Sequence, residues 1–258
     1  MCGVAGQARA IPGEGRQEEV RAERIVLIGA RRGGTAYFAC KRVIDVALVI
    51  LLSPLVVPVV LLLCVIVCLD SSGPPIFTQQ RIGARRVRRD GASEWELRPF
   101  RFYKLRTMAH NADHALHRTY LDAYITGDVE AIQRLNGRSD GSYKLAKDPR
   151  ITRVGATIRA LSLDELPQLW NVLKGDMSLV GPRPPIDYEL ERYTPSQMQR
   201  LAGPAGLTGS WQVNGRSALT FEEMVDLDTS YLARRSLLLD LTILVRSLGV
   251  VVSRKGAG

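Results

Sequence analysis

The segment VALVILLSPLVVPVVLLLCVIVCL (residues 46–69) decides the fold, because it contains no charged residue over 24 consecutive positions. About 20 apolar residues are enough for a helix to cross the hydrocarbon core of a bilayer. The alternative is a helix buried in the core of a soluble protein, which rarely needs an apolar run of this length. The sequence therefore predicts a segment embedded in a membrane.

Ser53-Pro54 lies near the middle of this run, and Pro58 follows one turn later. A proline kinks a helix and frees a backbone carbonyl, and a neighbouring hydroxyl helps to satisfy the freed groups. Basic residues flank the run on both sides: Arg31, Arg32, Lys41 and Arg42 before it, and Arg81, Arg85, Arg86, Arg88 and Arg89 after it. A spanning helix carries its basic excess on one side only. We therefore predict a broken helix over residues 41–70 that enters one leaflet and returns, with a single span as the alternative.

A second apolar segment, SLLLDLTILVRSLGVVVS (236–253), lies close to the C-terminus. Its apolar residues recur with helical spacing, whereas Asp240, Arg246 and Ser247 lie off the apolar face. The apolar face consists of Leu237, Leu238, Leu241, Leu244, Val245 and Leu248. We expect an amphipathic helix that either lies in the membrane interface or packs against the globular part of the protein.

The composition predicts an anionic partner, because the 258-residue chain has a net charge of +9. Nucleic acid, acidic lipid and a phosphorylated substrate all fit this charge, although an aromatic content of 6% argues against stacking on single-stranded bases.

The four cysteines contain no CxxC pair, which is typical of a reduced, cytosolic protein. The first 24 residues are polar and carry no secretory signal. The stretch RIVLIGARRGG (24–34) predicts a strand and a glycine turn, and it lacks the full GxGxxG of a dinucleotide site.

Residues 81–106 hold nine Lys or Arg against three Asp or Glu, so this segment also fits a basic surface on acidic lipid. At its end, FRFYKLRTM (100–108) alternates apolar and basic residues with the period of a strand. Lys104 and Arg106 are then expected on one side of the strand, where they are suited to bind phosphate.

Three histidines, His110, His114 and His117, fall in a polar stretch (109–135) that we expect to be helical. Their spacing puts them on one helix face, which is a pattern that binds metal ions. No carboxylate or cysteine is placed to complete and orient such a site. A solvated helix face is the favoured interpretation.

The stretch SLDELPQLWNVLKG (162–175) places Asp164 and Glu165 at the expected start of a short helix. Ser162 and Glu165 match a capping box, and acidic residues stabilise a first helical turn. Starting the helix at Asp164 keeps Pro167 in that turn, where no backbone donor is needed. The apolar residues of the expected buried face are Leu166, Leu169, Trp170 and Leu173. Capping and chemistry both remain open for the acidic pair on this stretch alone.

Three segments rich in glycine, proline or charge each contain an arginine that is a candidate for binding phosphate. KDPRITRVGATIRALSLDE (147–165) contributes Arg159, MSLVGPRPP (177–185) contributes Arg183, and GLTGSWQVNGR (206–216) contributes Arg216. Rigid turns that present a guanidinium are suited to bidentate phosphate binding. Several arginines converging on an acidic pair would be hard to explain by structure alone.

Together these motifs resemble the bacterial sugar transferase family, the monotopic phosphoglycosyl transferases. The resemblance covers about residues 41–253 and rests on specific stretches. They are KRVIDV (41–46), the Ser53-Pro54 break, FTQQRIG (77–83), YKLRTM (103–108), SLDELPQLWNVLKGDMSLVGPRP (162–184), GLTGSWQVNGR (206–216) and DLDTSYL (226–232). Larger members of the family carry further N-terminal membrane helices and a domain, so residues 1–40 are expected to be a piece of a linker.

The resemblance implies a reaction in two steps. Asp164 would attack the sugar-proximal phosphorus of a UDP-sugar and expel UMP, and polyprenyl phosphate would then take the sugar-phosphate from Asp164. Glu165 would ligate a magnesium ion that neutralises the diphosphate. The phosphate-binding residues would be Arg159, Arg183 and Arg216, with Lys104 and Asp228 near them. Lys41 and Arg42 would anchor the start of the membrane helix among lipid headgroups.

The fold implied is α+β and predominantly helical, in a monotopic membrane protein. A linker (1–40) would precede the re-entrant helix (41–70) and a catalytic domain (71–258) on the cytoplasmic face of the bacterial inner membrane, ending in an interfacial helix.

The product would start an exopolysaccharide, capsule, O-antigen or glycoprotein glycan. Expected partners besides the two substrates are membrane lipids, a second copy of the chain and downstream glycosyltransferases, but no nucleic acid. The alternative is a non-catalytic membrane-anchored protein that binds acidic lipid or nucleic acid, although such a surface has no use for two acids amid arginines.

Overall fold

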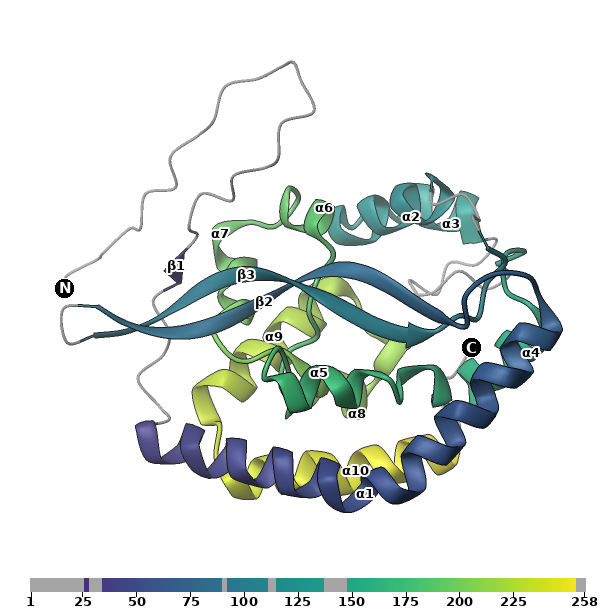
Figure 1. Ribbon diagram of the computed structural model, residues 1–258. Coiled ribbons are helices and arrows are strands. Elements are labelled where there is room, and N and C mark those ends of the chain that lie inside the picture. The colour runs from purple at the N-terminus through teal and green to yellow at the C-terminus, as the bar shows by residue number, and fades with distance from the viewer. Residues whose placement is uncertain (1–25, 28–33, 90–91, 111–114, 137–147, 254–258) are drawn as a thin grey trace, which may run out of the picture.

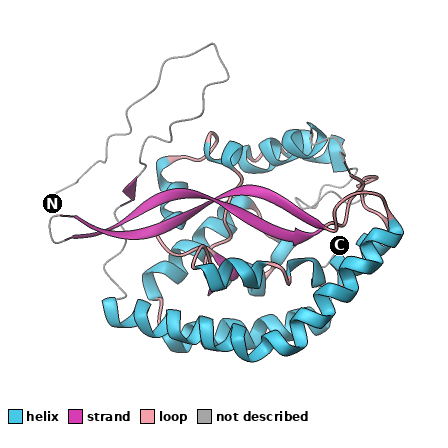
Figure 2. Ribbon diagram, in the orientation of Figure 1, coloured by secondary structure: helices cyan, strands magenta, loops and turns pink. Residues whose placement is uncertain are grey.

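The computed structural model describes residues 26–27, 34–89, 92–110, 115–136 and 148–253, and Figure 1 shows their arrangement. As predicted, helices predominate, and the strands form two small sheets (Figure 2).

The apolar run lies in one long helix, α1 (Thr35–Asp70), which begins ahead of the predicted start at Lys41. The most apolar part of α1 has a mean hydropathy of 3.1 and is only 11% buried, so α1 is long and apolar enough to cross a membrane. A helix buried in a soluble core is therefore the wrong interpretation.

The chain stays helical through Pro54 and Pro58, so the predicted break takes the form of a bend in a continuous helix. Figure 1 shows α1 curving along one side of the molecule and its distal half turning toward the other elements. Ser53 Oγ donates a hydrogen bond of 2.8 Å to the Ile50 carbonyl. The hydroxyl thus binds a backbone acceptor of the preceding turn, next to the prolines that bend the helix.

Two long strands, β2 (Ile76–Arg89) and β3 (Ala92–Leu105), form a twisted antiparallel hairpin across the molecule (Figure 2). The short β1 (Val26–Leu27) pairs with the other edge of β3. The strand predicted at 100–108 is confirmed, but it ends at Leu105, before Arg106.

A second sheet pairs β4 (Ser178–Val180) in parallel with β5 (Gly206–Thr208). The two strands approach closely because Gly206 has no side chain: a Cβ there would lie 2.1 Å from the Gly181 nitrogen. This contact brings together the chain after β4, which carries Arg183, and the chain after β5, which continues through α8 (Ser210–Asn214) to Arg216.

Short helices connect and cover these strands. They are α2 (Ala115–Thr126), α3 (Val129–Asn136), α4 (Arg153–Ala160), η1 (Leu163–Glu165), α5 (Gln168–Lys174), α6 (Asp187–Leu190), α7 (Pro195–Met198), η2 (Gln199–Leu201), α8 (Ser210–Asn214), η3 (Arg216–Ala218), α9 (Phe221–Arg234) and α10 (Leu237–Ser253).

The C-terminal helix α10 packs against the globular part of the protein, which confirms one of its two predicted arrangements, and its place in a membrane interface stays a prediction. Asp240 and Ile243 are buried against the protein, whereas the other side of the helix is exposed and apolar. The exposed apolar residues are Leu237, Leu238, Leu241, Val245, Leu248 and Val251. Figure 1 shows α10 and α1 on the same side of the molecule, away from α2 and α3.

Lys41 was expected among lipid headgroups, and this expectation is wrong. Its side chain is buried and forms an ion pair of 3.0 Å with Asp240 of α10. Arg42 is half-buried and donates hydrogen bonds to the carbonyls of Val172 and Leu173 at the end of α5. Both cations therefore bind other elements of the protein rather than extending into solvent.

The predicted histidine face is only partly visible, because His114 lies outside the described residues. His117 Nδ1 lies 3.3 Å from the Tyr188 hydroxyl, and His110 lies against Gly73. In the described part of the chain, no group of three or more His, Cys, Asp or Glu side chains is placed to hold a metal ion.

Candidate active site

Asp164 and Glu165 lie in η1, a single 3-10 turn that precedes α5. Ser162 has the left-handed backbone (φ 55°, ψ 22°) and its side chain makes no capping hydrogen bond, so the predicted capping box is wrong. A serine in this region of backbone space is strained, and such strain is concentrated at functional sites. Trp170 is another difference, because it is 57% exposed rather than part of the buried face of α5.

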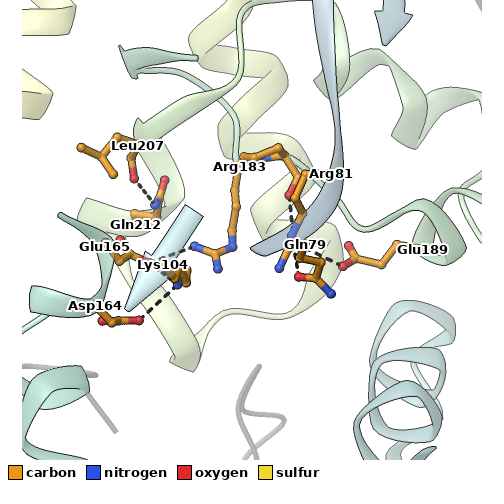
Figure 3. A network of polar contacts seen from close by, with 10 residues as sticks. Gln79, Arg81, Lys104, Asp164, Glu165, Arg183, Glu189, Leu207 and Gln212 are labelled. Atoms are coloured by element: carbon orange, nitrogen blue, oxygen red, sulfur yellow. Dashed lines mark hydrogen bonds and ion pairs between the residues drawn. The ribbon is translucent and has the colours of Figure 1, made fainter. Parts of the chain in front are cut away.

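Lys104, at the end of β3, joins the two carboxylates (Figure 3). Its Nζ lies 2.9 Å from Glu165 Oε1 and 3.3 Å from Asp164 Oδ2. Asp164 is buried, and the side chain of Lys104 is only 18% exposed, so water weakens this attraction less than at an open surface. The predicted association of Lys104 with the acidic pair is confirmed.

Arg183 binds the same oxygen of Glu165 as Lys104 does, with its Nη1 3.4 Å from Oε1. The loop that carries Arg183 is fixed, because Pro182 and Pro184 are fully buried. Arg81 of β2 also donates a hydrogen bond of 3.0 Å to the Pro184 carbonyl. In Figure 3, Arg183 stands between the acidic pair and a group formed by Gln79, Arg81 and Glu189.

Arg216 is the third cation of the site, and it also has a left-handed backbone, with φ 52°. Burial lowers the pKa of its guanidinium, and the negative charge of Glu165 opposes this effect. Gln212 lies on the same side of Arg183 as the acidic pair and donates a hydrogen bond of 3.0 Å to the Leu207 carbonyl (Figure 3). Gln212 was not among the residues predicted from the sequence, although it lies between two glycine turns and close to Arg216 in the chain.

The two carboxylates have different electrostatic surroundings. Burial by itself raises the pKa of the Glu165 carboxyl, but the charges of Lys104 and Arg183 outweigh it and lower this pKa to about 2. Glu165 is therefore ionised at every physiological pH. Among the residues that the structure describes, the only cation that pairs with Asp164 is Lys104, at the longer distance of 3.3 Å.

Asp228, which was predicted near the phosphate-binding arginines, is bound to a different residue of the protein. Asp228, in α9, is fully buried and pairs with Arg200, with its Oδ2 2.6 Å from Nη2 and 3.0 Å from Nε. Burial raises the pKa of Asp228 to about 6 against the influence of Arg200. A carboxylate enclosed in this way does not contact a substrate directly, and its predicted place near the site stays a prediction.

Arg106 does not share the site with Lys104. It is buried, and its guanidinium donates hydrogen bonds to backbone carbonyls at the end of α1: those of Val67, Ser71, Ser72 and Gly73. Arg159, at the end of α4, interacts electrostatically with Asp148, so its predicted contact with phosphate stays a prediction.

The acidic pair is suited to a divalent cation. Asp164 and Glu165 present carboxylate oxygens to one shared cationic nitrogen, and Mg²⁺ prefers oxygen ligands. Magnesium is usually bound through one or two carboxylates together with substrate phosphates and water. The two carboxylates fit that kind of site.

Comparison with known proteins gives the same identification as the motifs. The sequence model of the family described as "Bacterial sugar transferase" matches residues 36–254. The UDP-galactose-lipid carrier transferase of Erwinia amylovora is 40% identical over 84% of this chain and 41% of the relative. The undecaprenyl-phosphate galactose phosphotransferase of Salmonella typhimurium is 39% identical over 84% and 41%. The exopolysaccharide production protein ExoY of Rhizobium meliloti is 36% identical over 84% and 87%. The chain thus spans about two fifths of the length of the first two relatives and most of the third.

Proposed function

The chain belongs to the bacterial sugar transferase family, and we propose that it transfers a sugar-1-phosphate from a UDP-sugar to polyprenyl phosphate, releasing UMP. Relatives named for exopolysaccharide production and for undecaprenyl-phosphate galactose phosphotransfer support this reaction. The product would start the assembly of a cell-surface glycan.

One observation carries the proposal: Lys104 and Arg183, from two separate segments, bind two adjacent carboxylates, and Arg216 from a third segment interacts electrostatically with Glu165. Phosphoryl transfer depends mainly on positioning and on positive charge around the phosphate oxygens. An acidic pair within a cationic pocket supplies both a nucleophile and that charge.

In the first step, an oxygen of Asp164 forms a bond to the sugar-proximal phosphorus, and the bond from that phosphorus to the UMP oxygen breaks. In the second step, an oxygen of polyprenyl phosphate attacks the same phosphorus, and the bond to Asp164 breaks. The bond between the sugar and its phosphate persists throughout. A carboxylate nucleophile thereby divides one transfer into two displacements, each with its own acceptor.

Arg183 and Arg216 are suited to bind the diphosphate oxygens, because guanidinium groups pair with phosphate in a bidentate way. Glu165, ionised and held by Lys104 and Arg183, would hold Mg²⁺ together with Asp164. The ion would neutralise part of the diphosphate charge when bound.

For the membrane, we propose that α1 enters one leaflet and returns, which leaves the catalytic domain on the cytoplasmic face. Contacts at both ends of α1 support this arrangement. Arg42 binds α5 near the beginning of α1, and Arg106 binds the end of α1. The two ends of a helix that crosses the bilayer once would be separated by about 30 Å of hydrocarbon. One globular body on one side of the membrane could not then contact both ends of the helix.

The test is UMP release by the protein in membranes supplied with Mg²⁺, polyprenyl phosphate and a panel of UDP-sugars. We expect release with at least one donor, and Asp164→Asn should abolish both turnover and the covalent phosphosugar adduct. The absence of UMP with every donor would contradict the proposed reaction and favour the non-catalytic alternative. Full activity of Asp164→Asn would contradict its role as nucleophile.

A further inference from the structure

The helix α1 is bound to the segments that carry Lys104, the acidic pair and Arg183. The first contact is at its distal end, where Arg106 donates to the Ser71 and Gly73 carbonyls at 2.7 and 3.0 Å. The Arg106 backbone N–H also donates to the Pro75 carbonyl at 2.8 Å. Because Lys104 is two residues before Arg106, these bonds fix the end of β3 against the end of α1.

The second contact lies beneath the acidic pair. Leu63 and Val67 of the distal half of α1 are buried in one cluster with Leu105. Leu163 and Leu166 pack against the same cluster, and they flank Asp164 and Glu165 on either side. The 3-10 turn that presents the carboxylates therefore rests on the part of α1 that follows the proline bend.

The third set of contacts comes from the half of α1 that precedes the bend. Arg42 donates to the carbonyls at the end of α5, with 2.6 Å to that of Leu173. Asp45 accepts a hydrogen bond of 2.6 Å from Ser178 Oγ and one of 3.3 Å from the Leu179 N–H, both in β4. Asp45 is buried, and β4 leads directly into the loop of Arg183.

We propose that α1 is part of the frame of the active site, and that Arg42, Asp45 and Arg106 are positioning residues. The distal half holds Lys104 and the acidic pair, whereas the proximal half holds β4, which leads to Arg183. The bend at Pro54 and Pro58 then sets the distance between the acidic pair and Arg183. This inference rests on the proposed function, because it assigns these residues to the geometry of that reaction. A displacement of about 1 Å in such a site costs on the order of 100-fold in rate.

The test compares Arg42→Gln and Arg106→Gln with Tyr37→Phe in the full chain. Tyr37 is the matched control, because it also ties α1 to the protein, through a 2.9 Å hydrogen bond to Asp240, but touches none of the segments that carry the site. We expect kcat per folded molecule to fall about 10- to 100-fold in the two arginine variants, with KM for the donor within about twofold. Arg106→Lys should recover part of the loss, and Tyr37→Phe should keep the kcat of the unaltered protein. Equal kcat per folded molecule in all variants would overturn the inference.

Hydrogen exchange supplies a readout that does not depend on catalysis. Arg106→Gln should speed exchange in residues 100–106 and 163–166, whereas Tyr37→Phe should speed it in residues 237–243. If the unaltered protein releases no UMP with any donor, the proposed function fails, and the exchange pattern still decides whether α1 holds the acidic turn. Unchanged exchange at 163–166 in Arg106→Gln would show that α1 is an anchor only.

Discussion

Asp164 and Glu165 are neighbours in the chain, but different sets of cations bind them. Lys104 and Arg183 both bind one oxygen of Glu165, Oε1, at 2.9 and 3.4 Å, and their charges lower the pKa of its carboxyl. A carboxylate whose negative charge is stabilised by two cations is a weaker nucleophile than one stabilised by a single cation. Among the described residues, Asp164 forms one ion pair, with Lys104 at the longer distance of 3.3 Å, so its negative charge is less strongly stabilised. This asymmetry supports the assignment of Asp164 as nucleophile.

The low pKa of Glu165 predicts a specific dependence of stability on pH. Since the folded protein holds this pKa below the ordinary value of 4.5, the carboxylate contributes stability above pH 4.5 that is lost as the pH falls toward about 2. The difference in free energy of unfolding between the unaltered protein and Glu165→Gln should be constant from about pH 5 to 8 and shrink below that range. Denaturant unfolding at a series of pH values measures it. Glu222→Gln, at an exposed position of α9, is the control and should change stability by less than about 0.5 kcal/mol. If the difference in free energy of unfolding between the unaltered protein and Glu165→Gln grows as the pH falls, the electrostatic account is contradicted.

Substitution of Asp228 should lower the stability of the protein without changing its binding of the UDP-sugar. Asp228→Asn removes the charge from a fully buried ion pair with Arg200, and the weakened bond should cost about 1–3 kcal/mol of stability. The KM for the UDP-sugar should stay within about twofold, because the enclosed side chain does not contact a substrate directly. Thermal unfolding and donor titration provide the two measurements. A tenfold rise in KM without loss of stability would show that Asp228 takes part in binding the substrate.

At the scale of elements, sequence patterns predict segments better than they predict contacts. The apolar run and the alternation around Lys104 predict α1 and β3, because each pattern depends on neighbours in the chain. The contact of Lys104 with Glu165 joins residues 61 positions apart, and only the resemblance to a family indicated it. Arg106 was misassigned because β3 ends one residue earlier, which frees Arg106 to bind the end of α1.

The predictions about helix capping and about the burial of charged side chains were wrong for a related reason. The Ser162 pattern favours a capping box, but the left-handed backbone at Ser162 prevents it, and no local signal marks that conformation. Asp228 and Lys41 are charged, and charged residues are usually exposed, so their burial in ion pairs depends on partners far along the chain.

The bend in α1 predicts the membrane topology. Cys40 is exposed near the start of α1, and Ser72→Cys would place a thiol just after its end. In a chain whose other cysteines are replaced by serine, both thiols should react with an impermeant reagent in inside-out membrane vesicles and neither in right-side-out vesicles. Labelling from opposite sides would establish a single span and contradict the re-entrant arrangement.

At the scale of the whole molecule, the exposed apolar surfaces of α1 and α10 lie on one side, and the lobe of α2 and α3 lies on the other (Figure 1). Single exposed apolar residues are ordinary, but two neighbouring helices that expose leucines over their length indicate contact with lipid. The acidic turn rests on the distal half of α1, so its depth follows the position of that helix in the membrane. α10 would then hold the body flat against the surface, where the phosphate of a lipid acceptor lies.

This arrangement predicts that the exposed face of α10 affects the reaction rate only when the lipid acceptor is in a bilayer. Leu241→Glu together with Leu248→Glu places two charges on the exposed face of α10, where burial in lipid is costly. We expect the protein to remain in the membrane through α1, and its rate with polyprenyl phosphate in vesicles to fall about tenfold, or about 1.4 kcal/mol in activation free energy. The rate with a short, water-soluble prenyl phosphate should be unchanged, because no residue of the site is altered. Val129→Glu, at an equally exposed apolar position of α3, is the control and should affect neither rate. An equal loss with both acceptors would show that α10 supports the fold of the catalytic domain rather than its approach to the lipid.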